Sequence, residues 1–271
     1  MAAAGECGKY EQPLWTSVVS GTIGGGVGVI VGYPFESVKV RMQTGRRARL
    51  FGSLFSGVSA PLLAVTPQWA LMYSMYFAAQ SFLDYDGPEA ARGALSGALC
   101  GLATASITAP VDAIKIQAQN EKLSASTVVR RLVATGGARA LGHGMLATCV
   151  HLVLSQAVFF AVYEHVLGRL DKKKKNKTTS GWFDWRPAGG AAGLVEWTTC
   201  MTTDTVKTRL QAGPLGTRYV DAWAATYRDG GLRCFYRGYV PMLCRAIPVN
   251  ASAYFVIELV NSTLLRWRVA S

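Results

Sequence analysis

The fold of this chain is decided by the segment GYPFESVKVRMQ, which spans residues 32–43 and recurs in outline twice more. The recurring pattern is a proline, an acid two residues later, a lysine three residues after the acid and a glutamine four residues after the lysine. The three copies are Pro34, Glu36, Lys39 and Gln43; Pro110, Asp112, Lys115 and Gln119; and Thr202, Asp204, Lys207 and Gln211, with threonine in place of proline. Because each copy lies at the end of a long apolar segment, the sequence predicts a threefold repeat.

Half of the 271 residues are hydrophobic and only 16% are charged, which is a composition typical of membrane proteins. A helix needs about 20 residues to cross a bilayer. Six apolar stretches approach or exceed this length, at residues 14–35, 58–83, 93–111, 145–168, 187–203 and 239–265. The sequence therefore predicts an all-α membrane protein of one domain, residues 1–271, with six transmembrane helices in three pseudosymmetric two-helix repeats at 14–84, 90–170 and 184–268.

The formal net charge is +12, and the basic residues gather in two runs, at residues 46–49 and 172–177. We interpret these runs as solvated loops or as contacts with anionic lipid headgroups, since no aromatic residues are interleaved with them as in a nucleic-acid surface. The cysteines and histidines lack metal-ligand spacing, and the sequence contains no phosphate-binding loop or nucleophile motif. We expect no enzyme activity, metal, cofactor or nucleic-acid partner.

The three motifs place opposite charges at equivalent helix ends. An acid and a base three residues apart lie on one helix face, and we expect Pro34 and Pro110 to bend their helices toward a common axis. The acid of one helix then reaches the base of the next. The predicted pairs are Glu36 with Lys115, Asp112 with Lys207, and Asp204 with Lys39. Charges at the bilayer edge are costly unless they are paired or hydrated, so we interpret the ring as a gate across one end of a cavity; snorkelling side chains are the alternative.

Three copies of this motif across six apolar segments resemble the mitochondrial carrier family, and the resemblance covers essentially the whole chain. It implies a barrel of six tilted helices with threefold pseudosymmetry in the inner mitochondrial membrane. It also implies a central substrate site between a matrix gate, formed by the motif ring, and an intermembrane gate that opens alternately with it. Gln117 occupies the position of a glutamine that braces a matrix salt bridge in some carriers. Membrane lipid, including anionic lipid such as cardiolipin, is an expected partner.

The phrases around Pro34, Pro61 and Arg245 are similar to those of the carnitine/acylcarnitine and ornithine-type carriers. Alignment with the family places substrate contacts on the second, fourth and sixth apolar stretches. These contacts fall on Ala64, on His151 and Leu152, and on Arg245, respectively. Carnitine-type carriers have an arginine and an aspartate where this chain has His151 and Leu152. We expect Arg245 to clamp a substrate carboxylate through two parallel hydrogen bonds.

Two residues of the fifth apolar segment add to this expected site. Glu196 is expected to hold either Arg245 or a substrate ammonium group, and Trp197 to offer a ring face to a cation. The alternative interpretation is that Glu196 and Arg245 neutralise each other as a structural pair.

The chain also departs from the family pattern at both ends. In the intermembrane gate the basic residues are replaced by Gln80, Leu167 and Asn261. We therefore predict that this gate is weak and that the protein rests open toward the intermembrane space. Only residues 44–54 separate Gln43 from Phe55 in the first repeat, whereas residues 212–235 of the third repeat leave room for a short surface helix.

These observations favour a carrier that exchanges a small carboxylate-bearing metabolite, such as an amino acid or a carnitine-like compound, by alternating access. An alternative is a transport-silent accessory subunit of a larger inner-membrane assembly, such as a respiratory or ATP-synthase complex, since the altered gate and short repeat free two surfaces from the demands of transport. A third alternative is a carrier relative outside mitochondria.

Overall fold

The computed structural model describes residues 14–45, 53–82, 88–174 and 185–270. Within these ranges the chain forms six long helices: α1 (Leu14–Gln43), α2 (Ser59–Phe82), α3 (Glu89–Glu121), α5 (Met145–Lys174), α6 (Trp185–Ala212) and α9 (Tyr239–Ala270). Each contains nearly all of one predicted apolar stretch, because a continuous helix satisfies its own backbone hydrogen bonds where water is absent. The first long helix of each repeat (α1, α3 and α6) continues past its apolar stretch and includes the charged motif. Pro34 and Pro110 lie inside helices α1 and α3.

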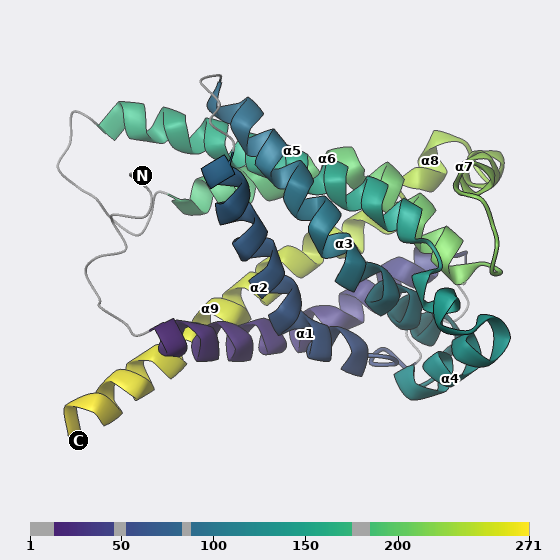
Figure 1. The fold of residues 1–271 in the computed structure, drawn as a ribbon, viewed down its shortest axis with the longest axis horizontal. Helices are drawn as coiled ribbons and strands as arrows, with labels where there is room; N and C mark the ends of the chain where they lie inside the picture. The colour runs from purple at the N-terminus through teal and green to yellow at the C-terminus, as the bar shows by residue number, and fades with distance from the viewer. Residues whose placement is uncertain (1–13, 46–52, 83–87, 175–184, 271) are drawn as a thin grey trace.

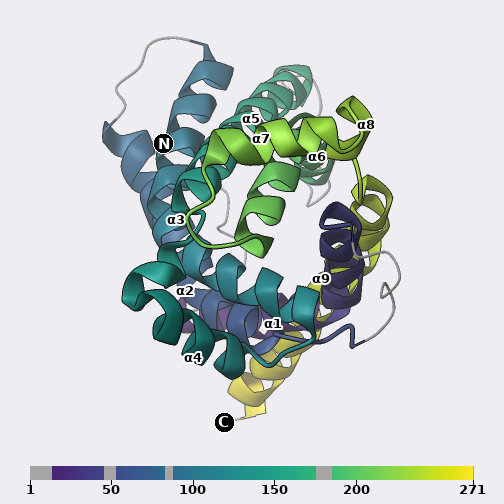
Figure 2. The same cartoon turned by 90° about the vertical axis from the view of Figure 1, so that its right-hand side faces the viewer.

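The long helices lie around a common axis, as the end-on view in Figure 2 shows. Contacts join α1 to both α9 and α2, α2 to α3, α3 to α5 and α5 to α6. The remaining neighbours, α6 and α9, are linked where the hydroxyl oxygens of Thr198 and Tyr239 lie 2.8 Å apart. Figure 1 shows the short helices at one end of this bundle and the C-terminal end of α9 at the other. We call the end with the short helices the motif end, since the three charged motifs also end there.

The surface of the bundle is unusually apolar for a protein in water, and several charged and amide side chains are buried. Large apolar side chains are exposed on the outside, with Leu63 81% and Phe82 86% accessible, whereas Arg41 is only 1% accessible. Such a surface is costly in water and suits hydrocarbon. By length and composition, two segments of the described chain qualify as membrane spans, Glu89–Glu121 and Ala138–Val166. The predicted all-α membrane class agrees with this architecture, and the full set of six crossings stays a prediction.

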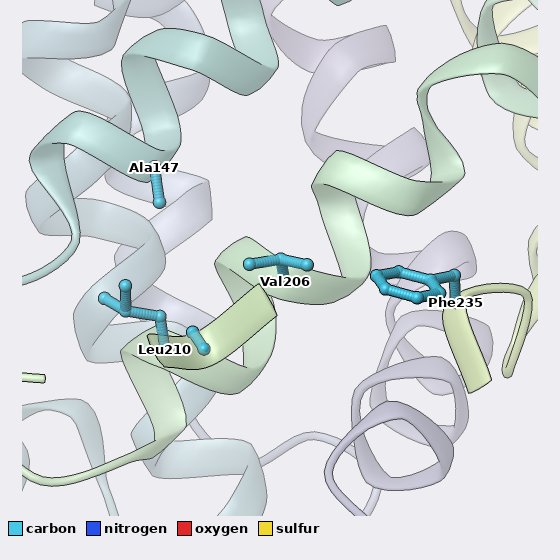
Figure 3. Close-up of a cluster of buried hydrophobic side chains, with 5 residues drawn as sticks. Ala147, Val206, Leu210 and Phe235 are labelled. Atoms are coloured by element: carbon cyan, nitrogen blue, oxygen red, sulfur yellow. The ribbon is translucent and has the colours of Figure 1, made fainter. Parts of the chain in front are cut away.

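Short helices follow the motifs of the second and third repeats. They are α4 (Ala125–Gly136), the 3-10 helix η2 (Ala138–Gly142), α7 (Tyr219–Arg228) and α8 (Leu232–Phe235). Helix α7 is the surface helix predicted within residues 212–235. It contributes Ala222 to a buried apolar cluster whose members Ala147, Val206, Leu210 and Phe235 are seen in Figure 3. In the first repeat the described residues between α1 and α2 form no helix, and the basic run at 46–49 lies outside the described residues.

Three glycines mark the threefold relation between repeats. Gly57, Gly144 and Gly238 lie just before the first residues of α2, α5 and α9, respectively. Their φ angles are +80°, +81° and +87°, values that favour glycine. A Cβ atom added to them would lie 2.5 Å from the Ala118 Cβ, 2.6 Å from the Gln211 Cγ and 3.0 Å from the Lys39 Cγ, respectively. Each glycine therefore lets its loop pack closely on the motif helix of the next repeat.

Candidate substrate site and gate

Three ion pairs join α1, α3 and α6 into a closed ring at the motif end. The pairs are Glu36 with Lys115, Asp112 with Lys207, and Asp204 with Lys39. The Lys39 Nζ atom lies 2.8 Å from the Asp204 Oδ2 atom, and the Lys207 Nζ atom lies 2.6 Å from the Asp112 Oδ2 atom. All three pairings predicted from the threefold repeat are thus present.

The ring is largely shielded from solvent. The side chains of Lys39 and Asp204 are 9% and 8% accessible, and those of Lys207 and Asp112 are 7% and 17% accessible. Burying charges carries a desolvation cost that a close partner of opposite sign offsets. Removing one partner of a pair would therefore leave a buried charge without compensation.

A glutamine supports one of these pairs, although it is not the predicted one. The Gln43 side chain donates from Nε2 to the Asp204 Oδ2 atom at 2.8 Å and to the Thr205 hydroxyl at 3.1 Å. Gln117, predicted as the brace, instead donates from Nε2 to the Gln211 carbonyl at 3.3 Å and accepts from Arg131 at 3.0 Å. In this structure the Gln117 amide thus contacts the backbone of α6 and a side chain of α4, and a role as brace of an ion pair stays a prediction.

A second ring of hydrogen bonds accompanies the ion pairs. In each repeat, the residue two positions after the motif lysine donates to the backbone carbonyl of the motif glutamine in the next repeat. The three contacts are Arg41 Nε to Gln119 O at 3.1 Å, Gln117 Nε2 to Gln211 O at 3.3 Å, and Arg209 Nε to Gln43 O at 2.7 Å. The repeated glutamine and its neighbouring donor were the sequence signal for this ring, but the carbonyl acceptors cannot be recognised from side-chain patterns.

Arg245 of α9 also reaches the ion-pair ring. Its Nη1 atom lies 2.5 Å from the Oε1 atom of Glu36, whose other carboxylate oxygen pairs with Lys115. Glu196 does not pair with Arg245, because it accepts a hydrogen bond from the Ser155 hydroxyl of α5. The structural pair considered for Glu196 and Arg245 is therefore absent from this structure.

The other predicted contact residues lie at different distances from the ring. Ala64, His151 and Arg245 are equally spaced after Gly57, Gly144 and Gly238, and so occupy equivalent positions. His151 is buried; its Nδ1 atom lies 3.0 Å from the Thr203 hydroxyl and its Nε2 atom 3.8 Å from the Asp204 Oδ1 atom. Ala64 is buried in α2.

Leu152 and Trp197 have surroundings that the sequence did not predict. The backbone carbonyl of Leu152 faces α3 closely, since a Cβ atom added to Gly101 would lie 2.4 Å from it. The sequence predicted that the Trp197 ring would offer its face to a cation, but did not identify that cation as the gate lysine Lys39, whose Nζ atom lies 4.9 Å from the ring centroid. Such an arrangement contributes a favourable cation–π interaction.

The predicted intermembrane gate falls on side chains that lie outside the described part of the structure, including those of Gln80, Leu167 and Asn261. Its weakness stays a prediction.

Two charged groups near the ring lie outside its three lysine-acid pairs. The three lysines of the ring match its three acids, so Arg245 adds a cation and Glu196 adds a carboxyl group beyond the matched set. A guanidinium can hold a carboxylate in two parallel hydrogen bonds, and a carboxylate can hold an ammonium group. The arrangement is suited to a small solute with a carboxylate, with or without an ammonium group.

Comparison with known proteins gives the family. The chain matches the family model described as "Mitochondrial carrier protein" over residues 10–50, 86–174 and 186–267. It is 31% identical to mitochondrial magnesium exporter 1 of Drosophila melanogaster, with 94% of this chain and 96% of the relative covered. It is 27% identical to the mitochondrial carnitine carrier of Saccharomyces cerevisiae, with 93% and 89% covered, and 28% identical to the mitochondrial basic amino acids transporter of Homo sapiens, with 89% and 88% covered. A threefold motif, a helical bundle and a match over most of the chain agree, and this protein belongs to the mitochondrial carrier family.

Proposed function

We propose that this chain is a carrier of the mitochondrial inner membrane that exchanges a small carboxylate-bearing metabolite by alternating access. The observation that carries the proposal is Arg245, a partly accessible guanidinium of α9 that contacts Glu36 and is not needed to balance the lysine-acid ring. The ion-pair ring acts as the matrix gate in this proposal, and Arg245, His151, Leu152, Glu196, Trp197 and Ala64 surround the substrate.

The substrate class follows from the two groups outside the balanced ring. Arg245 binds the carboxylate, and Glu196 binds an ammonium group if the substrate has one, so amino acids and carnitine-like compounds are the first candidates. Relatives named as a carnitine carrier and a basic amino acids transporter support this choice. A relative named as a magnesium exporter makes Mg²⁺ a necessary member of any substrate panel. Because these relatives are named for transport, the comparisons do not favour the accessory-subunit alternative.

Uptake into liposomes tests the proposal directly. Purified protein is reconstituted in vesicles that contain cardiolipin, the expected anionic lipid, and the vesicles are preloaded with carnitines, amino acids, dicarboxylates, nucleotides or Mg²⁺. We expect exchange of at least one carboxylate-bearing solute, loss of this exchange in Arg245→Ala, and normal exchange in Arg130→Ala, a matched control at an exposed position of α4.

Two results would contradict the proposal. The first is failure of every solute in the panel while a known carrier, reconstituted in parallel, exchanges its own substrate. The second is comigration of the native protein in fixed ratio with a respiratory or ATP-synthase assembly on a blue-native gel, together with no exchange; this combination would favour the accessory subunit.

A further inference from the structure

The short connection of the first repeat leaves α1 without the cover that the other repeats give to their motif helices. In the second and third repeats a surface helix follows the motif: α4 has 12 residues and α7 has 10. These helices lie within residues 120–140 and 212–234, between the motif glutamine and the start of the next long helix. In the first repeat, residues 44–53 alone lie between the equivalent positions. This segment is too short for such a helix with a connection on either side.

The third repeat shows what the surface helix covers. Val206 and Leu210 of α6 and Phe235 of α8 are 0%, 4% and 3% accessible. Helix α7 packs on them through Ala222 and through Trp223, whose ring centroid lies 5.0 Å from that of Phe235 (Figure 3). The helix therefore removes an apolar patch of the motif end from water, which stabilises the folded chain.

The second repeat has the same arrangement with other side chains. Val128 and Leu132 of α4, one helical turn apart, form a buried cluster with Ala118 of α3, and Leu141 packs against this cluster. Ala118 and Leu141 hold positions equivalent to those that α7 covers in the third repeat, counted from the motif and from the positive-φ glycine. In both repeats the covering element is thus a short helix with an apolar face.

In the first repeat the equivalent residues are Val38, Met42 and Leu54. Each of them is partly accessible, and no short helix of the described chain covers them. We call these three residues the uncovered patch. The Ser37 hydroxyl donates to the Leu54 carbonyl at 2.5 Å, which holds residue 54 against this turn of α1.

The loop that contributes Leu54 is fixed by α1 itself. Three side chains of α1 donate to backbone carbonyls of this loop. They are the Arg41 Nη2 atom to Ser53 at 2.9 Å, the Ser37 Oγ atom to Leu54 at 2.5 Å and the Tyr33 hydroxyl to Ser56 at 2.7 Å. Because these bonds already order the loop, a partner can dock on the uncovered patch without first having to order it, which favours binding.

The position of the uncovered patch argues against cover by lipid tails or by a chain terminus. Val38 and Met42 lie beyond the apolar stretch 14–35, within the charged turns of α1. The first residue of α1, Leu14, and the last residue of α9, Ala270, lie at the opposite end of the bundle (Figure 1). A segment of another molecule is better placed to cover the patch.

The charge around the uncovered patch indicates the kind of partner. Residues 37–83 contain no aspartate or glutamate, and the run 46–49 that follows α1 contributes three arginines. Lys122 is exposed and lines the same pocket as Leu54. A positive surface attracts an acidic partner and disfavours one of like charge. A second copy of this chain, with its net charge of +12, is therefore disfavoured.

We propose that the uncovered patch docks an acidic amphipathic helix of a partner protein at the motif end. This helix takes the place that α4 and α7 hold in the other two repeats and is of similar length, about three turns. Apolar residues spaced three or four apart contact Val38, Met42 and Leu54, as in other complexes of a helix with an apolar groove. The docking surface lies outside the ion-pair ring, so the inference does not depend on the transported solute.

Photo-crosslinking in intact mitochondria identifies what lies on the uncovered patch. The photoreactive residue p-benzoylphenylalanine replaces Leu54 in the full-length protein. As a matched control it replaces Leu141, the equivalent residue beside the α4 cluster. Crosslinked peptides are identified by mass spectrometry. Each probe is also combined with Met42→Gln, which makes the patch more polar, and with Val38→Thr, which changes polarity with little change of shape.

We expect the probe at position 54 to crosslink one partner protein, on a peptide with acidic residues and apolar residues three or four apart. The probe at position 141 should react within its own chain. Met42→Gln and Val38→Thr should lower the intermolecular yield, with about a tenfold loss for Met42→Gln, because an apolar side chain leaves the interface. The internal adduct at position 141 should persist in both variants, which shows that they are folded.

A synthetic peptide with the crosslinked sequence then tests the charge of the partner. It should bind the purified protein in cardiolipin-free nanodiscs, and binding should weaken at least tenfold between about 0.05 M and about 0.5 M salt because salt screens the charges. Binding that salt does not affect, or a crosslinked peptide without acidic residues, would overturn the acidic partner.

Several outcomes would overturn the docking site itself. They are adducts at position 54 with lipid alone, with a second copy of this chain or within the chain alone, and the absence of any adduct while position 141 reacts. An unchanged intermolecular yield in both Met42→Gln and Val38→Thr, with the internal adduct at position 141 retained, would show that the partner binds elsewhere.

Discussion

Neutralising Asp112 gives the cleanest test of the ion-pair ring, because Lys207 is its only partner among the described ion pairs. Asp204 is less suitable, since Gln43 and His151 also approach it. Asp112→Asn leaves the Lys207 ammonium, 7% accessible, without its counter-ion. Removing one partner of a buried pair costs about 3–5 kcal/mol. Lys207→Met should cost less, because the remaining Asp112 carboxylate is 17% accessible and keeps more of its hydration.

Thermal unfolding of the protein in nanodiscs measures these costs. For a chain of this size about 1 kcal/mol corresponds to roughly 2 °C in Tm, so Asp112→Asn should lower Tm by about 6–10 °C. The double variant should lose less than the sum of the single losses, which is the signature of coupled residues. Glu121→Gln is the matched control: it breaks the pair with Arg131, whose side chain is 42% accessible, and exposed pairs contribute about 1 kcal/mol or less. Additive losses, or equal shifts for Asp112→Asn and Glu121→Gln, would refute the reasoning.

Three further predictions follow from local geometry. Gly144→Ala should lower the free energy of unfolding by about 1–3 kcal/mol, since the φ of Gly144 is +81° and an added Cβ would lie 2.6 Å from a side chain of α6. Gly142→Ala should change this free energy little, because Gly142 has open space around it. Chemical denaturation of the two variants compares these effects. Gly97→Ala should destabilise the folded protein by about 1–3 kcal/mol, because the added Cβ would lie 2.3 Å from a backbone carbonyl of α5. Gly193→Ala should instead leave the stability unchanged or raise it by up to about 1 kcal/mol. Destabilisation by both variants would contradict the close packing of α3 on α5. Glu196→Gln should reduce uptake of substrates with an ammonium group at least tenfold and spare simple carboxylates; equal losses in liposome uptake would exclude the proposed ammonium contact.

The ion-pair ring could be predicted from sequence because the acid and the lysine lie three residues apart within one segment, and this spacing recurs in all three repeats. An acid and a base at fixed spacing, present three times, allow only a cyclic pairing once the helices are related by threefold symmetry. The helix positions followed from apolar length for the same reason, since a segment such as 145–168 is too long and too apolar for any other element. The motif helices extend further than the apolar stretches because their charged turns remain helical and bind one another.

The contacts that escaped prediction depend on direction and reach. Gln43 and Gln117 are both amides near the ring, and sequence could not show which of them points toward Asp204. Arg245 was identified as important, but its partner is Glu36 of α1 and neither Glu196 nor another residue of its own repeat. Glu196 contacts Ser155 for a comparable reason, as α5 is its neighbour in the bundle. The partner of each of these side chains depends on the residues of adjacent helices, and therefore cannot be recognised from the pattern of one segment.

The two ends of the bundle differ in symmetry, and the difference limits how the protein can move. At the motif end all three repeats contribute equivalent pairs. Toward the opposite end, added Cβ atoms on Gly93, Gly97 and Gly101 of α3 would lie 2.6, 2.3 and 2.4 Å from backbone carbonyls of α5, whereas Gly190 and Gly193 of α6 have no described heavy atom within 4 Å. The helices of the second repeat already touch backbone to backbone and cannot approach further. Closer packing at that end is therefore limited most strongly between α3 and α5.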